Sequence, residues 1–457
     1  MIVSKNSRSG LIKYWLPEVG HALTSRVAFT LAVLMAVVVS SVKGWSGLHS
    51  WAMSNWEISY DFGFFKRGLL GTLTRPLLDS GWLGWNRTDW VLVVGSVLLV
   101  LFGMLVVWLT LQAGRQSGGK TRPSRTDQLI LLALLVSPLM VMASNLVGYL
   151  DYAVYLLGAG AIGCALQRKY LIATGLLLVA ILIHEAALFV GYPIAVLTII
   201  FQQARLGRHS LLFWKWPGAA QVMTLAPLLV LGWIFYTQSH FEQSDALRTY
   251  LLQRCEQDLR LLDFRPSKIY PGAEHMVELI MHSFDGFWQE ELSKGLQRLK
   301  DTESLVVFGP LLAWLLLATL AAMVGLPFRL LLSVLLVLAS LAPLLMHLIA
   351  FDTNRIWLMP VVNLLFARWV VQNYQQRPAG LLAELLTDLG AIVLIVAYSV
   401  LTPIVMVDEL ILTLYFYDYV IWYALTMLVA VSIFIGKYYP LVQAGKLVLA
   451  ARTAQFD

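Results

Sequence analysis

The chain has 457 residues, of which 59% are hydrophobic and only 13% are charged, and its net charge at pH 7 is +6. Its mean hydropathy is +0.72. Soluble globular domains contain about 25% charged residues, so this composition excludes a water-soluble globule and predicts an all-α polytopic membrane protein. The basic excess is expected to record membrane topology, because no nucleic-acid-binding motif accompanies it.

A helix needs about 20 apolar residues to cross a bilayer, and about 12 segments of the chain meet this expectation. The basic leader before the first segment continues into Trp45 without a small-residue cleavage site, so this segment is predicted to be a retained helix. In chain order the predicted spans are 27–46, 89–112, 128–147, 151–167, 170–184, 187–203, 219–237, 305–324, 329–349, 356–371, 386–406 and 419–436.

The orientation follows from Lys and Arg in short loops, which favour the cytoplasmic side. Placing both termini in the cytoplasm keeps the basic residues of nearly all short loops inside, as expected for a bacterial inner (plasma) membrane protein. Two long loops then face outward, at 47–88 and 238–304. The second is polar and helix-forming, so we expect one integral domain, 1–457, with a helical extracytoplasmic cap. Cys164 and Cys255 fall on opposite sides, which excludes a disulfide between them.

The first outer loop contains the stretch SYDFGFFKRGLLGTL, Ser59 to Leu73. Lys66 and Arg67 lie on the side where basic residues are disfavoured, and a bound anion would explain them; charges tolerated beside lipid head groups are the alternative. Its apolar residues predict a short helix in the membrane interface, with Asp61 before it and Pro76 helping to end it.

His184 and Glu185 mark an outward turn between two unusually short spans. Each arm has about 15 residues and reaches roughly 22 Å, which is shorter than a hydrocarbon core of about 30 Å. The turn is therefore expected below the outer surface, where an ionisable residue usually has a partner and often a function. A purely structural hydrogen-bonded pair is the competing interpretation.

Two other outward turns also carry polar residues. Asp151 lies between the third and fourth spans, and His347, Asp352 and Arg355 lie between the ninth and tenth. The spacing of Asp352 and Arg355 permits an ion pair on one helical face. Alternatively, the planar guanidinium of Arg355 holds a phosphate.

All these turns face the same side in the predicted topology, which brings acids, imidazoles and fixed cations together. Such a set suits a transferase for a lipid-linked phosphate substrate, because a carboxylate accepts the acceptor's proton and cations neutralise the leaving phosphate. The cytoplasmic loops lack a Walker A motif and a nucleotide-sugar domain. The residues of this outward set are Asp61, Lys66, Arg67, Asp151, His184, Glu185, His347, Asp352 and Arg355.

No cofactor is certain, although a divalent metal is compatible with such chemistry. The segment EHMVELIMH would place His275, Glu278 and His282 on one helical face of the cap. A solvated helix face explains the same spacing and is preferred, so no metal ligands are assigned.

With its many spans and its outer loop Trp56–Leu73, which carries Asp61, the chain resembles the GT-C class of integral membrane glycosyltransferases. The resemblance concerns layout over about the first 240 residues, and the loop has a single acid where many members have a pair. It implies a polyprenyl-phosphate-linked sugar donor used outside the cytoplasm. The chain is also similar to bacterial O-antigen and exopolysaccharide polymerases, which join glycans on undecaprenyl pyrophosphate.

Both resemblances imply a membrane glycosyltransferase whose partners are a polyprenyl-linked sugar or glycan, a glycan acceptor and lipids. Asp61 is the first choice for catalytic base and Glu185 the second. Lys66, Arg67 and Arg355 would bind phosphate, and the substrate-orienting residues would be Asp151, His184, His347 and Asp352. The alternatives are a transporter or lipid-linked-glycan flippase and a non-catalytic subunit of an envelope complex.

Overall fold

The structure is a computed structural model, and the residues that it describes form helices and no β-strand. The described residues are 26–45, 48, 50–60, 64, 67–79, 85–112, 124–207, 211–241, 245–246, 248–253, 277, 302–324, 326–348, 353–375, 380–405, 424 and 426–440. The chain divides into two compact units, and α5 (Arg87–Gln112) and α7 (Pro138–Asn145) contribute residues to both.

The first unit combines residues 1–43, 110–141 and 380–457. It contains α2 (Arg26–Gly44), α6 (Arg125–Val136) and α18 (Leu381–Val405), together with a helix over 426–440. Helix α18 packs against α6. The Ser40 hydroxyl donates a 2.8 Å hydrogen bond to the carbonyl of Leu135, which joins α2 to α6.

The second unit combines residues 44–109 and 142–379 and holds the remaining helices. They are α3 (Ser50–Glu57), α4 (Gly68–Asp79), α8 (Asp151–Leu166), α9 (Tyr170–Ile183), η4 (Glu185–Leu188), α10 (Tyr192–Leu206), η6 (Phe213–Lys215), α11 (Gly218–Phe241), α15 (Thr302–Ala322), α16 (Arg329–Leu341), η7 (Ala342–Leu348) and α17 (Thr353–Tyr374).

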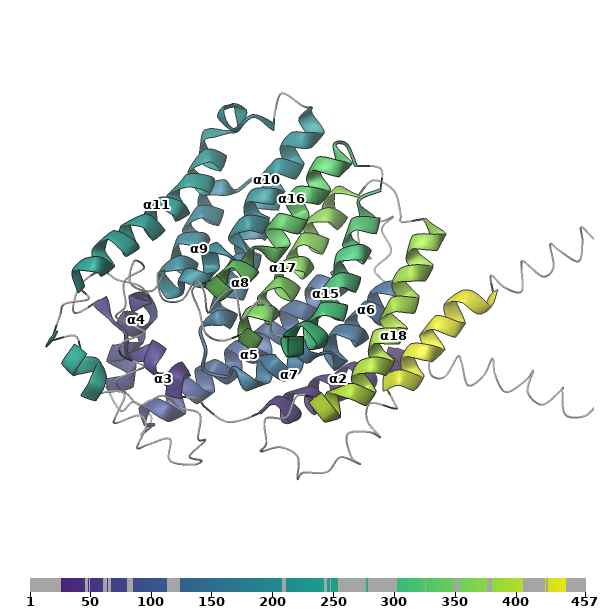
Figure 1. Cartoon of the computed structure of the whole chain (residues 1–457), viewed down its shortest axis with the longest axis horizontal. Helices are drawn as coiled ribbons and strands as arrows, with labels where there is room; N and C mark the ends of the chain where they lie inside the picture. The colour runs from purple at the N-terminus through teal and green to yellow at the C-terminus, as the bar shows by residue number, and fades with distance from the viewer. Residues whose placement is uncertain are drawn as a thin grey trace, which may run out of the picture. The chain divides into compact units, whose positions relative to one another are not determined.

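The long helices of the second unit pack side by side in an order that differs from their order in the sequence. Helix α9 lies between α11 and α8, α10 joins α8 to α16, and α17 contacts α16 and α15 (Figure 1). Because of this order, the start of α17 lies near the turn that follows α9, although about 170 residues separate them.

Several helices are long and apolar enough to cross a membrane. Seven of the described helices meet this condition, or eight if the bent pair α6 and α7 forms one span. Helices also occupy the other predicted spans up to residue 406, but α8 and α9 are shorter, at 16 and 14 residues. The last predicted span, 419–436, is only partly described, so the count of about 12 stays a prediction, as does the cap over 238–304.

Helix α11 displays the surface expected of a lipid-facing helix. Its exposed large side chains recur every three or four residues at Leu225, Leu229, Trp233 and Tyr236. Residues at this spacing lie on one face of a helix, and a bilayer, unlike water, stabilises an apolar face.

The predicted break between the fifth and sixth spans is present. Helix α9 ends at Ile183, and α10 begins only at Tyr192, after the short η4 helix and Gly191. Gly191 has φ +78°, and its Cα faces that of Gly158 on α8 so closely that an added Cβ would lie 2.9 Å from it. The Asn363 side chain of α17 accepts from Gly191 N–H at 3.0 Å and donates to the Phe189 carbonyl at 2.9 Å.

The loop 47–88, predicted to be the first outer loop and called so below, contains two short helices, α3 and α4, but Pro76 does not end the second as predicted. Helix α4 continues through Pro76 to Asp79. A proline inside a helix removes one backbone hydrogen bond. The bond missing here is the one to the Thr72 carbonyl, and the Thr72 and Thr74 hydroxyls donate to the carbonyls of Gly68 and Leu70 one turn earlier, at 2.7 and 2.8 Å.

Replacing Gly191 with alanine is expected to destabilise the second unit. A side chain at φ +78° is strained, and the Cβ would displace α8, so we expect a loss on the order of 1–3 kcal/mol. Gly175→Ala in α9 is the matched control, because an added Cβ there meets nothing within 4 Å. Thermal unfolding in detergent should show a lower midpoint for Gly191→Ala only; equal midpoints for the two variants would contradict the tight contact.

Candidate functional site

Arg67 reaches the site from the predicted first outer loop, where its backbone is strained. It immediately precedes α4 with φ 62°, a left-handed conformation that is uncommon outside glycine. The loop is fixed on both sides: Tyr60 N–H donates to the Thr72 hydroxyl at 2.8 Å, and an added Cβ on Gly71 would lie 2.0 Å from the Ile58 carbonyl oxygen. Residues in such conformations persist where their surroundings fix them, often at functional sites.

Tyr60 forms part of the same support. Its ring stacks on Phe64 with centroids 5.1 Å apart and lies against Gly68, where no Cβ fits. Burial raises the pKa of Tyr60 to about 12, so the phenol stays protonated at neutral pH. It is therefore a packing residue of the loop rather than a source of charge.

The guanidinium of Arg67 forms a forked ion pair with Glu185. Its Nε lies 2.9 and 3.1 Å from the two carboxylate oxygens, and its Nη2 also contacts Oε1. Nη1 donates to Asn55 Oδ1 at 3.1 Å. The first outer loop is thereby tied to the turn after α9 through one side chain with a two-oxygen geometry that only arginine provides.

A second ion pair joins α8 to α17. The Nε of Arg355 lies 2.7 Å from Asp151 Oδ2, and its Nη2 donates to Oδ1 at 3.0 Å. The guanidinium carbon lies 4.9 Å from the centroid of the Tyr149 ring, a cation–π distance. The Asp151 side chain is only 1% exposed, and an unpaired carboxylate at this depth would be very costly to bury. The Arg355 guanidinium offsets part of that desolvation cost.

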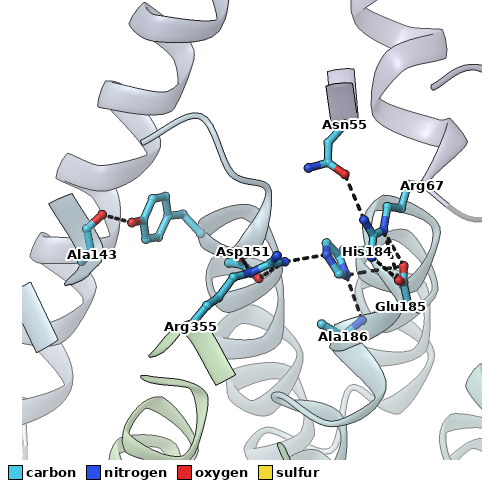
Figure 2. Close-up of polar contacts among 9 residues, drawn as sticks. Asn55, Arg67, Ala143, Asp151, His184, Glu185, Ala186 and Arg355 are labelled. Carbon is cyan, nitrogen blue, oxygen red and sulfur yellow. Dashed lines mark hydrogen bonds and ion pairs between the residues drawn. The ribbon is translucent and has the colours of Figure 1, made fainter. Parts of the chain in front are cut away.

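His184 lies between the two ion pairs (Figure 2). Its Nε2 is 2.7 Å from Arg355 Nη2, and its Nδ1 accepts the backbone N–H of Ala186 at 3.0 Å. Nδ1 also lies 3.5 Å from Glu185 Oε2. One buried imidazole thus connects two arginines and two carboxylates that come from the first outer loop, α8, η4 and α17.

The structure brings five of the nine predicted site residues together: Arg67, Asp151, His184, Glu185 and Arg355. His347 is fully buried, with its ring 6.0 Å from that of Trp357. The other predicted residues, Asp61, Lys66 and Asp352, lie outside the described residues. The predicted ion pair between Asp352 and Arg355 therefore stays a prediction, although the described partner of Arg355 is Asp151.

Sequence reasoning missed two residues of the surroundings, Asn55 and Asn363. Asn55 is 3% exposed and accepts a hydrogen bond from Arg67, but nothing in the sequence WAMSNWE distinguishes it from an ordinary polar residue of a loop. The sequence did contain a signal for Asn363, because a single amide in the apolar segment PVVNLLF is expected to need hydrogen-bond partners within a helix. It donates to Phe189 and Ala339 and accepts from Gly191, and so it holds the turn of His184 to the helix of Arg355.

Among the residues described, no group of three or more His, Cys, Asp or Glu side chains is arranged to hold a metal ion. His275, Glu278 and His282 of the cap lie outside them. The described cluster is instead an arrangement of two carboxylates with two guanidiniums, which suits charge pairing and anion contact.

Comparison with known proteins found no family model that matches the chain and no curated protein or solved structure similar to it.

The pairing of Arg67 with Glu185 can be measured with a double-mutant cycle. Arg67→Gln and Glu185→Gln should each destabilise the protein, and the double variant should lose less than the sum, with a coupling of about 1–3 kcal/mol. Unfolding by denaturant in detergent provides the measurement.

The control for this cycle combines Glu185→Gln with Arg205→Gln. Arg205 lies near the far end of α10 and faces the Tyr374 ring, so these two changes are expected to add. Additive losses for the Arg67 and Glu185 pair would show that the forked contact contributes nothing to folding.

Proposed function

We propose that the chain is a membrane glycosyltransferase that acts at the extracytoplasmic face of the bacterial inner membrane. It would transfer a sugar or glycan from a polyprenyl-(pyro)phosphate-linked donor during assembly of a cell-envelope polysaccharide or glycoconjugate. This proposal keeps both termini in the cytoplasm and agrees with the resemblance to GT-C enzymes and polysaccharide polymerases.

One observation carries the proposal: charged residues of three separate segments, all predicted to face outward, meet around His184. Arg67 comes from the predicted first outer loop, Asp151 from the first residue of α8, and Arg355 from the start of α17. A structural salt bridge needs two residues, whereas this cluster brings together five ionisable side chains with Asn55 and Tyr149. Ionisable clusters of this kind in a membrane protein mark functional sites more often than simple packing.

In the proposed reaction, an acceptor hydroxyl attacks the anomeric carbon of the donor sugar. The new bond joins the acceptor oxygen to this carbon, while the bond from the carbon to the phosphate oxygen breaks and leaves its electron pair on the polyprenyl (pyro)phosphate. The hydroxyl proton passes to a carboxylate, for which Asp61 remains the first choice. Cations beside the phosphate stabilise the charge that develops on the leaving group.

The contacts of Glu185 make it the weaker candidate for the base. Both of its oxygens face the Arg67 guanidinium, and an adjacent positive charge stabilises the carboxylate and reduces its basicity. Asp61 is six residues before Arg67 in the sequence, which keeps it close to the cluster along the chain. Lys66 and Arg67 would then contribute positive charge near the phosphate of the donor. No cofactor is certain for this reaction, and a divalent metal is compatible with it.

The described charges of the first unit favour the alternative function, a transporter or flippase for lipid-linked glycans. Lys437 Nζ lies 2.7 Å from Asp388 Oδ2 and 3.0 Å from Glu384 Oε2. The two carboxylates belong to α18, which is apolar enough to span the membrane. Ionisable groups at such positions also occur on ion and substrate pathways. Transport into vesicles without glycan transfer would select this alternative.

Asp61→Asn is the direct test of the transferase. Loss of a general base should reduce transfer from polyprenyl-linked sugars on the order of 100-fold or more, while the protein stays in the membrane at normal amounts. Asp89→Asn is the control, since Asp89 is an exposed residue in the first turn of α5, just after the same loop, where its side chain accepts from Asn86 N–H at 3.2 Å. Full transfer by both Asp61→Asn and Glu185→Gln would reject the assignment.

A further inference from the structure

Arg168 has a backbone conformation in which glycine is the usual residue. Helix α8 ends at Leu166, and Arg168 follows two residues later with φ 62°. Its N–H donates to the Ala165 carbonyl at 2.9 Å, and the next N–H, of Lys169, donates to the Cys164 carbonyl at 2.8 Å. This is the pattern of a helix end whose left-handed residue is most often glycine. A cation is favourable at a helix end, but an arginine one position earlier would provide it without this strain.

A second arginine, Arg205, lies in the last turn of α10 and faces the ring of Tyr374. Its guanidinium carbon lies 5.5 Å from the ring centroid, a cation–π distance. Tyr374 is the last residue of α17, beyond the predicted span 356–371, and its ring stacks on Phe201 with centroids 5.8 Å apart. Burial raises the pKa of Tyr374, whereas the charges of Arg205 and Arg168 lower it. Both arginines therefore lie near this one hydroxyl group.

Gln202 joins the helix ends that carry the two arginines. Its Nε2 donates to the Ala165 carbonyl at the end of α8 at 2.8 Å, and its Oε1 accepts from the Tyr170 hydroxyl at the start of α9. Arg168 follows Ala165 by three residues, and Arg205 follows Gln202 by three. The joined helix ends therefore keep the arginine pair, Arg168 and Arg205, at the same end of the second unit, where both side chains are exposed.

No Asp or Glu forms an ion pair with the arginine pair within the part of the chain that the structure describes. The sequence supplies few candidates. From 152 to 241 the only acid is Glu185, which lies at the other end of α9 and contacts Arg67, and from 353 to 383 there is none. An anion that contacts both guanidiniums would relieve their mutual repulsion.

The surface beside the arginine pair is apolar, as at a membrane boundary. Leu171 near the start of α9 and Leu206 at the end of α10 are exposed. Trp214 of η6, which follows α10, is also exposed, and tryptophan favours the level of the lipid head groups. This end of the unit is the one predicted to face the cytoplasm, where the membrane leaflet carries anionic lipids.

We propose that Arg168 and Arg205 bind the phosphate of one anionic phospholipid of the cytoplasmic leaflet, with an acyl chain along the exposed leucines beside them. A zwitterionic phospholipid fits less well, because its quaternary ammonium group would face the same two cations. His184 and Glu185 follow the opposite end of α9, a helix of 14 residues and about 21 Å. The lipid site is therefore separate from the proposed transfer site and does not depend on it.

Thermal unfolding of the purified full-length protein in a neutral detergent tests the site, with phosphatidylglycerol, phosphatidylcholine or inorganic phosphate added. Phosphatidylglycerol alone should raise the midpoint at low concentration. Arg205→Gln should weaken the apparent affinity for this lipid about fivefold, which is the contribution of one arginine near a membrane surface. Arg168→Gly should weaken it similarly without lowering the midpoint in the absence of lipid, because glycine is unstrained at φ 62°.

Arg329→Gln is the matched control. Arg329 is an exposed arginine at the start of α16, on the same predicted side of the membrane, and its variant should bind the lipid like the wild type. An equal loss of affinity in Arg329→Gln would instead indicate attraction to the overall positive surface and overturn the site.

Other results would also overturn the proposal. Equal stabilisation by phosphatidylglycerol and phosphatidylcholine would remove the requirement for an anionic lipid. Inorganic phosphate that stabilises as strongly as the lipid at the same concentration would show an anion site without lipid. Arg168→Gly with a lower midpoint and wild-type lipid affinity would show that this arginine serves the fold alone.

Discussion

The cost of placing charge among apolar helices is the constraint on which the second unit depends. A lone guanidinium or carboxylate loses most of its hydration there, and a partner with matched geometry compensates only when the hydrogen bonds are also satisfied. Asp151 and Arg355 meet this condition across α8 and α17, and Arg67 and Glu185 meet it across the outer loop and η4. The charged residues therefore specify which segments must meet.

Backbone details in this unit serve the same contacts. Arg67 and Gly191 both have positive φ, Arg67 where the chain enters α4 and Gly191 where the turn enters α10. Asn363 fixes the second of these to α17, the helix that carries Arg355 in its first turn. A turn held at both ends keeps His184 and Glu185 in place without a long helix on either side.

The sequence predicted which parts of the chain form apolar helices and where the short pair breaks, because both follow from the spacing of apolar residues. It also singled out Arg67, Asp151, His184, Glu185 and Arg355, because ionisable residues in outward turns of an apolar chain are rare. It did not predict their pairing. The pair of Arg355 with Asp151, 204 residues away, could not be read from the sequence, since helix order in space is not encoded in local spacing.

The paired state of the cluster bears on how such a site would work. Two carboxylates already satisfy the two arginines, so an incoming phosphate gains affinity only where donors remain that the carboxylates do not satisfy. His184 lies between the two pairs, and both of its ring nitrogens are engaged within the protein, Nδ1 by Ala186 N–H and Nε2 by Arg355.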